Sequence, residues 1–270
     1  MNSNTQTIIY KFKNKLKTSF LFIFLNKTLK GLLSVFKNYK SYHADLKKFK
    51  NSSKKTNIRF SKRYNFYPIL TDKTSITNIE PHYTYHPAWA ARILAQTKPI
   101  KHVDISSTLT FCTLVSAFVP FEFYDYRPAN LHLSNLKSEH ADLTQLHFDS
   151  NSISSLSCMH TLEHVGLGRY GDPIDYDGDL KAMSELKRVL AEGGDLLVVF
   201  PIGKPVIEYN AHRIYSYEQV LLHFEPLELI EFSLIPDDHV NVGIIKNATK
   251  EQSDAQNWGC GCFWFKKTKI

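Results

Sequence analysis

Three aspartates each accompany a short apolar run, and their carboxylates are the first candidates for binding a small molecule. Asp104 falls near the end of residues 100–105, Asp125 ends residues 121–125, and Asp142 sits at the tip of a further short run. Ionised carboxylates form short, strong hydrogen bonds with hydroxyl and amino groups. If the runs are parallel strands, their carboxyl ends meet at one edge of the sheet, where ligands bind. We therefore expect the three side chains at one edge, although each alone is also typical of a loop aspartate that caps a turn.

Three histidines are candidates for a general base. His160 and His164 follow the apolar residues 154–159, and His212 follows the apolar residues 195–201. An imidazole titrates near neutrality and is therefore suited to taking a proton from a hydroxyl group. For each of the three, the ordinary alternative is a structural role, as a histidine hydrogen-bonded to the backbone.

An acidic, glycine-rich stretch lies between these histidines. Asp172 and Asp175 are followed by two more aspartates at alternate positions, a pattern that resembles sites for hard cations. The final glutamate of a calcium loop is missing, so we expect no metal. A helix cap formed by one of the last two aspartates and an acceptor-binding lid hinged at glycines are the alternatives. Arg169 and Arg213 are suited to pairing with an anionic acceptor.

The four cysteines add no second metal signal. Cys260 and Cys262 are separated by one residue, which is not the spacing of a zinc site, and no further Cys/His pair completes one. Cys112 and Cys158 fit buried core positions. Sparse thiols and the lack of a recognisable export signal favour a reducing, cytoplasmic compartment.

The candidate residues lie among elements that alternate along the chain. We expect helices at residues 86–96, 108–118, 179–190 and 216–224. We expect strands at residues 100–105, 121–125, 154–159, 195–201, 226–236 and 259–266, with one more just before residue 141. Gly193 and Gly194 are expected to end the third helix. Alternation of this kind implies right-handed βαβ crossovers and a parallel sheet with helices on both faces, in a domain that spans residues 64–270.

Charge is divided unevenly along the 270 residues. Residues 1–63 hold 16 of the 33 Lys+Arg residues and one of the 26 acids, a net +15, which leaves −8 for residues 64–270. The overall net charge of +7 therefore describes neither part of the chain. It does not indicate that the whole chain is a basic nucleic-acid-binding protein. The chain length fits one globular domain with an appendage, and four cysteines are too few for a disulfide scaffold.

The basic arm at residues 8–40 carries bulky apolar residues at roughly helical spacing between its lysines. Its longest uncharged run, between Lys17 and Lys27, is too short to span a bilayer. An amphipathic helix of this kind is suited to an anionic membrane surface, which makes residues 8–40 a candidate membrane contact. Packing on a partner or on the chain's own domain, and a solvated tail, are the alternatives. Residues 46–63 are expected to form a flexible basic linker.

Residues 141–201 resemble the class I S-adenosylmethionine-dependent methyltransferases. The resemblance rests on residues 141–148 (ADLTQLHF), 162–165 (LEHV) and 188–194 (RVLAEGG). It implies a Rossmann-like methyltransferase fold, with a seven-stranded, mostly parallel sheet and a C-terminal antiparallel strand, preceded by the basic amphipathic helical arm. It also implies S-adenosylmethionine as the cofactor.

The resemblance gives the strand-end acids specific roles. Asp125 would bind the ribose hydroxyls, and Asp142 with the Leu143 N–H would hold the adenine, while Asp104 would lie near the cofactor's ammonium or orient the following loop. The family's first motif is acid-x-Gly-x-Gly, but here it is Asp-Ile-Ser-Ser-Thr, with Ser106 in place of the first glycine. Because a Cβ replaces each glycine, either the loop runs wider and its serine hydroxyls give hydrogen bonds, or cofactor binding is weakened or lost.

A narrower resemblance links residues 172–179 (DPIDYDGD) and 210–215 (NAHRIY) to an uncharacterised branch of this superfamily that occurs in bacteria and nematodes. In bacteria the branch accompanies surface-polysaccharide synthesis, which implies O-methylation of a sugar or glycolipid-linked saccharide at the inner face of a membrane. The rival expectation is a non-catalytic binding or scaffold protein that kept the sheet and lost the cofactor. Nucleic-acid methylation is disfavoured by the apolar face of the arm, so no nucleic-acid partner is expected.

Overall fold

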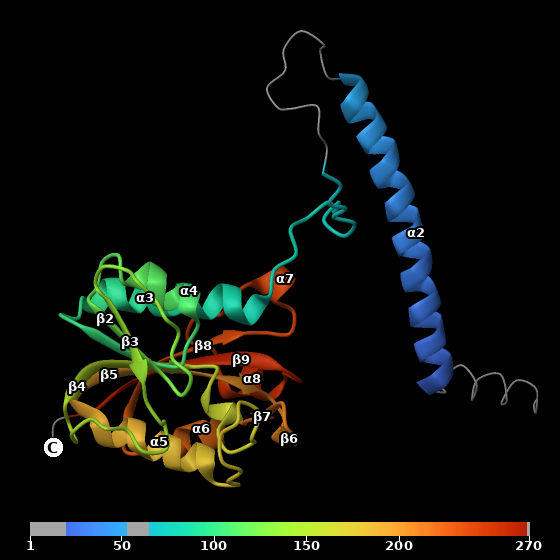
Figure 1. Cartoon of the computed structure of the whole chain (residues 1–270). Coiled ribbons are helices and arrows are strands. Elements are labelled where there is room, and N and C mark those ends of the chain that lie inside the picture. Colours follow the sequence, from blue (N-terminus) through green and yellow to red (C-terminus); the bar gives the residue numbers. More distant parts are fainter. Residues whose placement is uncertain (1–19, 53–64, 269–270) are drawn as a thin grey trace, which may run out of the picture. The chain divides into compact units, whose positions relative to one another are not determined.

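The computed structural model describes residues 20–52 and 65–268 (Figure 1). They form two compact units, with the boundary between Asn78 and Ile79. Residues 65–78, which the sequence analysis places in the globular domain, belong to the same unit as the basic arm.

The first unit is built on one long helix, α2 (Phe20–Ser52). The helix continues through residues 46–52, where a flexible linker was expected, because lysine and leucine favour a helix as long as no glycine or proline interrupts it. Residues 8–19 of the predicted arm lie outside the described residues. None of the described helices has the length and apolarity needed to cross a membrane.

The segment that follows the linker packs on this helix. Asn38 Nδ2 donates a hydrogen bond of 2.8 Å to Leu70 O, and the Lys73 ammonium lies 2.8 Å from the Asp45 carboxylate. Both partners of the ion pair are well exposed, so the pair contributes little to stability and mainly marks where the segment lies.

The second unit is built on a seven-stranded sheet with the order β3-β2-β1-β4-β5-β9-β8. The strands are β1 (His102–Ile105), β2 (Phe121–Asp125), β3 (Leu136–His140), β4 (Ile153–Met159), β5 (Leu190–Ile202), β8 (Glu228–Ile235) and β9 (Gly259–Lys266). Strands β1 to β5 pair in parallel, and β9 is antiparallel to both β5 and β8. The predicted Rossmann-like α/β fold with one antiparallel C-terminal strand is confirmed.

Helices cover both faces of this sheet (Figure 1). One face packs on α3 (Pro81–Thr97) and α4 (Leu109–Val115), with Trp89 and Phe111 in its core. The other face packs on α5 (Gly178–Val189) and α6 (Tyr217–Phe224), whose apolar side chains share a second core with the strands. Because helices bury both faces of the sheet, the sequences of the central strands are nearly continuous apolar runs.

Helix α3 begins five residues before the expected start at His86. Glu80 is extended and its carboxylate accepts a hydrogen bond of 2.6 Å from the Tyr83 N–H, which caps the helix. Pro81 fits the first helical position, where its missing N–H costs nothing. The early start places His82 and Tyr83 on the helix, facing the site described below.

The glycine pair at Gly193 and Gly194 does not end helix α5, as was expected. The helix ends at Val189 and β5 begins at once, so both glycines lie inside the strand, where its register against β4 shifts. Gly193 has a φ of 75°, and a Cβ on Gly194 would come within 2.8 Å of the Ala191 carbonyl oxygen. The pair therefore permits an irregularity at the start of the strand.

Small elements complete the second unit around the carboxyl edge of the sheet. They are the 3₁₀ turn η1 (Leu162–His164), the hairpin β6 (Val206–Glu208) and β7 (His212–Ile214), and the short helices α7 (His239–Val242) and α8 (Lys250–Asp254). The hairpin was not expected, and it fixes the position of His212.

Candidate functional site

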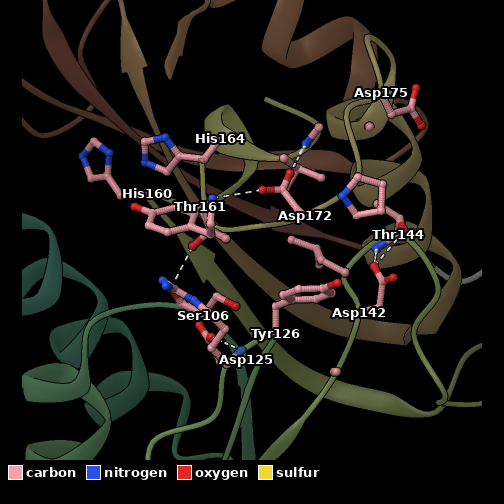
Figure 2. Close-up of a pocket in the computed structure, with 18 residues that line it drawn as sticks. Ser106, Asp125, Tyr126, Asp142, Thr144, His160, Thr161, His164, Asp172 and Asp175 are labelled. Atoms are coloured by element: carbon pink, nitrogen blue, oxygen red, sulfur yellow. Dashed lines mark hydrogen bonds between the residues drawn. The ribbon is translucent and has the colours of Figure 1, made fainter. Parts of the chain in front are cut away.

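A cavity of about 260 Å³ opens at the carboxyl ends of β1, β2, β3 and β4 (Figure 2). Eight of the predicted site residues line it, and they are Ser106, Asp125, Asp142, Leu143, His160, His164, Asp172 and Asp175. The expectation that strand-end residues converge on one edge is therefore met for two of the three aspartates. We call this space the first cavity.

Asp125 ends β2 and lines the first cavity. Its Oδ1 accepts a hydrogen bond of 2.7 Å from the Arg127 N–H, which turns the chain back after the strand. Tyr126 also lines the cavity, and Arg127 lies over the ring of Tyr170, 4.6 Å from its centroid. Sequence reasoning missed both tyrosines. The position of Tyr126 next to Asp125 was the available signal for one, whereas nothing in the sequence marked Tyr170.

Asp142 and Leu143 form another part of the cavity wall. Asp142 Oδ1 accepts hydrogen bonds from the Thr144 N–H (2.8 Å) and the Thr144 hydroxyl (2.7 Å). These bonds hold a tight turn after β3, so that the carboxylate stays half-buried at the cavity surface. The buried Leu143 side chain gives this wall its apolar surface.

Ser106 occupies the place of the first glycine in the resembled motif and keeps a glycine-like backbone. Its φ is 60°, in the left-handed region that residues with a Cβ adopt at a cost. Two contacts hold the loop: the Ser106 N–H donates to Tyr124 O (2.8 Å), and the Thr161 hydroxyl donates to Ser106 O (2.8 Å). The loop thus holds Ser106 in a left-handed backbone conformation at the cavity surface.

This conformation gives the first testable prediction. Ser106→Gly should leave the free energy of unfolding within about 1 kcal/mol of the parent, because relief of strain and the extra freedom of the unfolded chain nearly cancel. Ser106→Val should lower it by about 2 kcal/mol, since a β-branched residue is disfavoured at positive φ. Urea unfolding of the three proteins measures both effects, and equal stability of the glycine and valine variants would contradict the left-handed conformation.

Asp104 does not line the first cavity. It is fully buried in β1, and its carboxylate accepts hydrogen bonds from the Ser107 N–H (3.0 Å) and from the Ser157 hydroxyl. Burial raises the pKa of Asp104 to about 6, against the effect of these hydrogen bonds. Of the two roles expected for this residue, the position fits orientation of the following loop.

A series of buried hydrogen bonds extends from Asp104 to other side chains of the sheet. Ser157 also contacts His102 Nε2 (2.8 Å), and His102 Nδ1 contacts the Ser155 hydroxyl (2.7 Å). Since Ser157 donates its proton to Asp104, His102 donates from Nε2 and accepts at Nδ1. Complete burial lowers the pKa of His102 to about 3, so the ring is neutral.

A second cavity, of about 470 Å³, lies beside the first. His160 and His164 line both cavities, whereas Arg169 and His212 line only the second. The second cavity is also lined by Glu80, Tyr83, Asn210 and Trp258. Burial and then the nearby Glu163 raise the pKa of Tyr83 to about 12, so its hydroxyl remains protonated.

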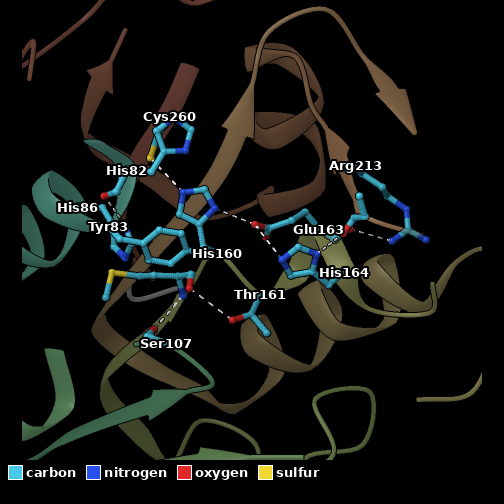
Figure 3. A network of polar contacts seen from close by, with 12 residues as sticks. His82, Tyr83, His86, Ser107, His160, Thr161, Glu163, His164, Arg213 and Cys260 are labelled. Atoms are coloured by element: carbon cyan, nitrogen blue, oxygen red, sulfur yellow. Dashed lines mark hydrogen bonds and ion pairs between the residues drawn. The ribbon is translucent and has the colours of Figure 1, made fainter. Parts of the chain in front are cut away.

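The three predicted histidines have different surroundings. His160 Nδ1 lies 2.8 Å from Glu163 Oε1, and His164 Nδ1 lies 2.6 Å from Ala211 O (Figure 3). Burial lowers the pKa of His164 below its usual value, although Glu163 acts in the opposite direction. Burial alone would raise the pKa of Glu163, but the two neighbouring imidazoles outweigh it and hold that pKa below the ordinary value.

His212 differs because no hydrogen bond to its ring is found among residues 20–52 and 65–268. Its ring lies nearly parallel to that of Trp258, with centroids 5.9 Å apart, and edge-on to His164 at 6.4 Å. The His212 imidazole is therefore held by aromatic contacts while both of its nitrogens stay available to a ligand.

Asp172 and Asp175 lie in the loop that covers the first cavity. Asp172 accepts hydrogen bonds from the N–H groups of Gly166 (2.8 Å), Gly168 (3.4 Å) and Tyr170 (3.2 Å), so it holds the loop together. The Asp175 carboxylate pairs with the exposed Lys181 ammonium. The first carboxylate is thus engaged with backbone, and the second lies toward solvent.

Arg213 is not brought to either of these cavities. It is 5 % exposed, and its guanidinium donates to the carbonyl oxygens of Val165 (2.7 Å) and Tyr176 (3.0 Å). Its Nε also lies 3.5 Å from the Asp179 carboxylate. The helix cap expected near this loop is not formed by a side chain: the residue at the N-cap of α5, Asp177, makes no capping hydrogen bond, because its backbone is not extended.

Comparisons with solved structures give likenesses at low identity. A putative methyltransferase from Bacillus halodurans C-125 is 16% identical, with 68% of this chain and 99% of that chain covered and a TM-score of 0.48. The N-methyltransferase NodS from Bradyrhizobium japonicum WM9, solved with S-adenosyl-L-homocysteine, is 12% identical over 68% and 86% of the chains, with a TM-score of 0.49. A putative sarcosine dimethylglycine methyltransferase from Galdieria sulphuraria is 14% identical over 67% and 85%, with a TM-score of 0.47.

A search of curated proteins found no match. A family model described as "Caenorhabditis protein of unknown function, DUF268" matches residues 122–257, from within β2 to just before β9. The matched residues are just over half of the chain and include the 172–179 and 210–215 stretches that pointed to an uncharacterised branch occurring in nematodes. The chain belongs to this DUF268 family.

Proposed function

We propose that this chain binds S-adenosylmethionine in the first cavity and transfers its methyl group to an acceptor in the second. The observation that carries the proposal is the convergence of Asp125, Asp142 and the Ser106 loop on one cavity at the carboxyl ends of β1, β2 and β3. Three separate segments thereby supply the two carboxylates and the loop that the sequence resemblance assigns to this cofactor.

The residues present fit the cofactor's chemistry. The Asp125 carboxylate suits two hydrogen bonds from the ribose hydroxyls, since ionised acceptors bind hydroxyl groups strongly. Asp142 and the apolar Leu143 suit the amino group and the face of an adenine. When bound, the cofactor supplies a methyl group already activated by its sulfonium, so the protein has mainly to position the acceptor.

The acceptor would lie in the second cavity, because His160 and His164 separate it from the first. His212 is the candidate base for the acceptor hydroxyl, since none of the described residues forms a hydrogen bond with its ring nitrogens. His160 and His164 are engaged with Glu163 and Ala211 and fit positioning roles better.

A sugar or glycolipid-linked saccharide fits this cavity. The Trp258 ring offers a flat apolar face, and Glu80, Asn210 and His212 offer hydrogen-bonding groups of the kind that hydroxyl-rich ligands need. Arg169 adds a positive charge for an anionic or phosphorylated acceptor. We place the reaction in surface polysaccharide synthesis, in the cytoplasm.

Calorimetric titration of the full chain with S-adenosylmethionine tests the proposal. We expect saturable binding, with competition from S-adenosylhomocysteine. Absence of heat at millimolar cofactor would overturn it and favour the alternative of a non-catalytic binding or scaffold protein. That alternative is motivated by the Ser106 Cβ, which faces the cavity where the resembled family has none.

We also propose that the basic arm binds an anionic membrane surface and holds the enzyme at the inner face of the membrane. Within the described part of the arm, Leu32, Val35, Phe36 and Tyr39 follow the spacing of one helical face, and all four are exposed, Phe36 to 67 %. The exposed Lys37 and Lys40 belong to the same stretch of the helix. Apolar insertion together with attraction to anionic headgroups would supply the binding energy.

A flotation assay checks the arm. The full chain should float with vesicles that contain phosphatidylserine and float less with pure phosphatidylcholine. A Leu32→Ser/Phe36→Ser variant should float less, because it removes apolar area from the face that inserts. The control Val240→Ser/Val242→Ser changes exposed apolar residues of the second unit and should float like the parent. Equal flotation of all three proteins would contradict the anchor.

A further inference from the structure

Three side chains with metal-ligating atoms meet in the second unit, although they are far apart in the sequence (Figure 3). His82 comes from the first turn of α3, His160 follows β4, and Cys260 lies near the start of β9. One ligand atom of each lies within 4.8 Å of the others, and all three residues are buried. We propose that these three residues bind a divalent ion of the zinc class. This inference does not depend on the proposed methyl transfer.

The hydrogen bonds around His160 orient it as a metal ligand. His160 donates a hydrogen bond from its Nδ1–H to Oε1 of the Glu163 carboxylate, 2.8 Å away. Nε2 is then the unprotonated nitrogen, and it lies 3.3 Å from the Cys260 sulfur. A histidine that binds a metal through one nitrogen usually donates its other N–H to a carboxylate, which fixes its tautomer and orientation.

The donor set selects the ion. Two imidazoles and one thiolate suit zinc and its borderline neighbours, whereas calcium and magnesium prefer oxygen ligands. Three protein ligands leave a fourth position for an oxygen ligand such as water. His82 and His160 both line the second cavity, so we expect that position on the cavity side.

An independent observation is the incomplete pairing of Glu163. Its side chain is 1 % exposed, yet Oε2 has no hydrogen-bond partner among the described residues. A buried carboxylate with one oxygen left without a hydrogen bond costs free energy. A divalent ion bound to one thiolate carries a net positive charge beside this carboxylate, which would compensate it. On binding, the Cys260 thiol would lose its proton to solvent, while His160 would keep its Nδ1 proton in the hydrogen bond to Glu163.

The experiment uses untagged full chain, stripped of metal and then loaded with one equivalent of Co²⁺ or Zn²⁺. We expect about one ion per chain after dialysis, by elemental mass spectrometry, and a near-ultraviolet band from thiolate-to-cobalt charge transfer. Cys260→Ser should lose the band, and Cys262→Ser, two residues along the same strand, should keep it. Absence of the band in folded parent protein would overturn the proposal, as would a band in Cys260→Ser equal to that of the parent.

Two further variants keep the test decisive if Cys260→Ser does not fold. His82→Asn should lose bound zinc while its circular dichroism stays that of the parent. Glu163→Gln should retain the cobalt band but bind the ion about 10- to 100-fold more weakly, as expected for a residue that orients a ligand. Parent affinity in both variants would place the ion elsewhere and overturn the proposal.

Discussion

Asp125→Ala should weaken binding of S-adenosylmethionine by about 100-fold, measured by calorimetry on the full chain. The carboxylate would accept two hydrogen bonds from the ribose, and hydrogen bonds to a charged group contribute about 1.5 kcal/mol or more each. Because Asp125 ends β2 and lies at the cavity surface, its removal leaves the sheet intact.

Two controls separate loss of the contact from loss of charge or of structure. Asp149→Ala removes an exposed carboxylate that does not line the cavity, and it should bind the cofactor like the parent. Asp125→Asn keeps an acceptor for the Arg127 N–H and should give an intermediate affinity, since its acceptor is neutral. Parent affinity in Asp125→Ala would refute the ribose assignment, while the cofactor proposal itself rests on the titration of the unmodified chain.

The second large effect concerns acid stability and arises from His102. The native pKa of about 3 lies below the unfolded value of 6.5, so at intermediate pH the unfolded chain binds a proton that the native chain does not. The contribution of His102 is therefore complete above pH 6.5 and is lost as the pH falls toward 3. The loss is about 1.4 kcal/mol per pH unit, or roughly 2 kcal/mol between pH 6.5 and pH 5.

His102→Gln removes this titration while keeping a donor and an acceptor for Ser157 and Ser155. Whatever the variant costs at pH 7.5, its stability relative to the parent should improve by roughly 2 kcal/mol at pH 5, measured by urea unfolding. Asp104 acts with the opposite sign, because its raised pKa makes the native state gain stability as the pH falls from about 6. That contribution is present in both proteins and cancels in their difference.

The control for this comparison is His132→Gln, which changes an exposed histidine. It should leave the pH dependence of unfolding unchanged. An unchanged difference between His102→Gln and the parent at pH 7.5 and pH 5 would contradict a neutral, buried His102.

Local patterns were sufficient for the sheet but not for its irregular parts. Strands β2 and β9 run over the expected residues, because apolar runs bounded by breakers have few other places to be buried. The Gly193–Gly194 pair was interpreted as a helix stop, since glycine commonly ends helices. Its actual position inside β5 depends on pairing with β4 and on a bulge, which are contacts between distant segments.

In the candidate site, too, the sequence was sufficient for some residues and not for others. Asp125 and Asp142 were found because the end of a parallel strand is a position that sequence can mark, and that edge of the sheet is where ligands gather. Asp104 has the same pattern and does not line the cavity, because the strand's alternation and the Ser157 hydroxyl below it turn its carboxylate into the core. A single residue of offset changes which face a strand side chain occupies.

The sequence by itself determined the order of the seven sheet strands and of the helices α3 to α6, the basic arm, and the acids at the strand ends, because all of these follow from local periodicity and composition. Only the tertiary structure decided that His82, His160 and Cys260 meet and that Arg213 donates to backbone carbonyl oxygens. It also decided that His212 packs on Trp258, with no hydrogen bond to its ring nitrogens from the described residues. The physical reason is that each of these outcomes depends on contacts between segments separated by tens of residues. No local spacing encodes them; the packing of α3, η1 and the β6–β7 hairpin around the sheet edge does.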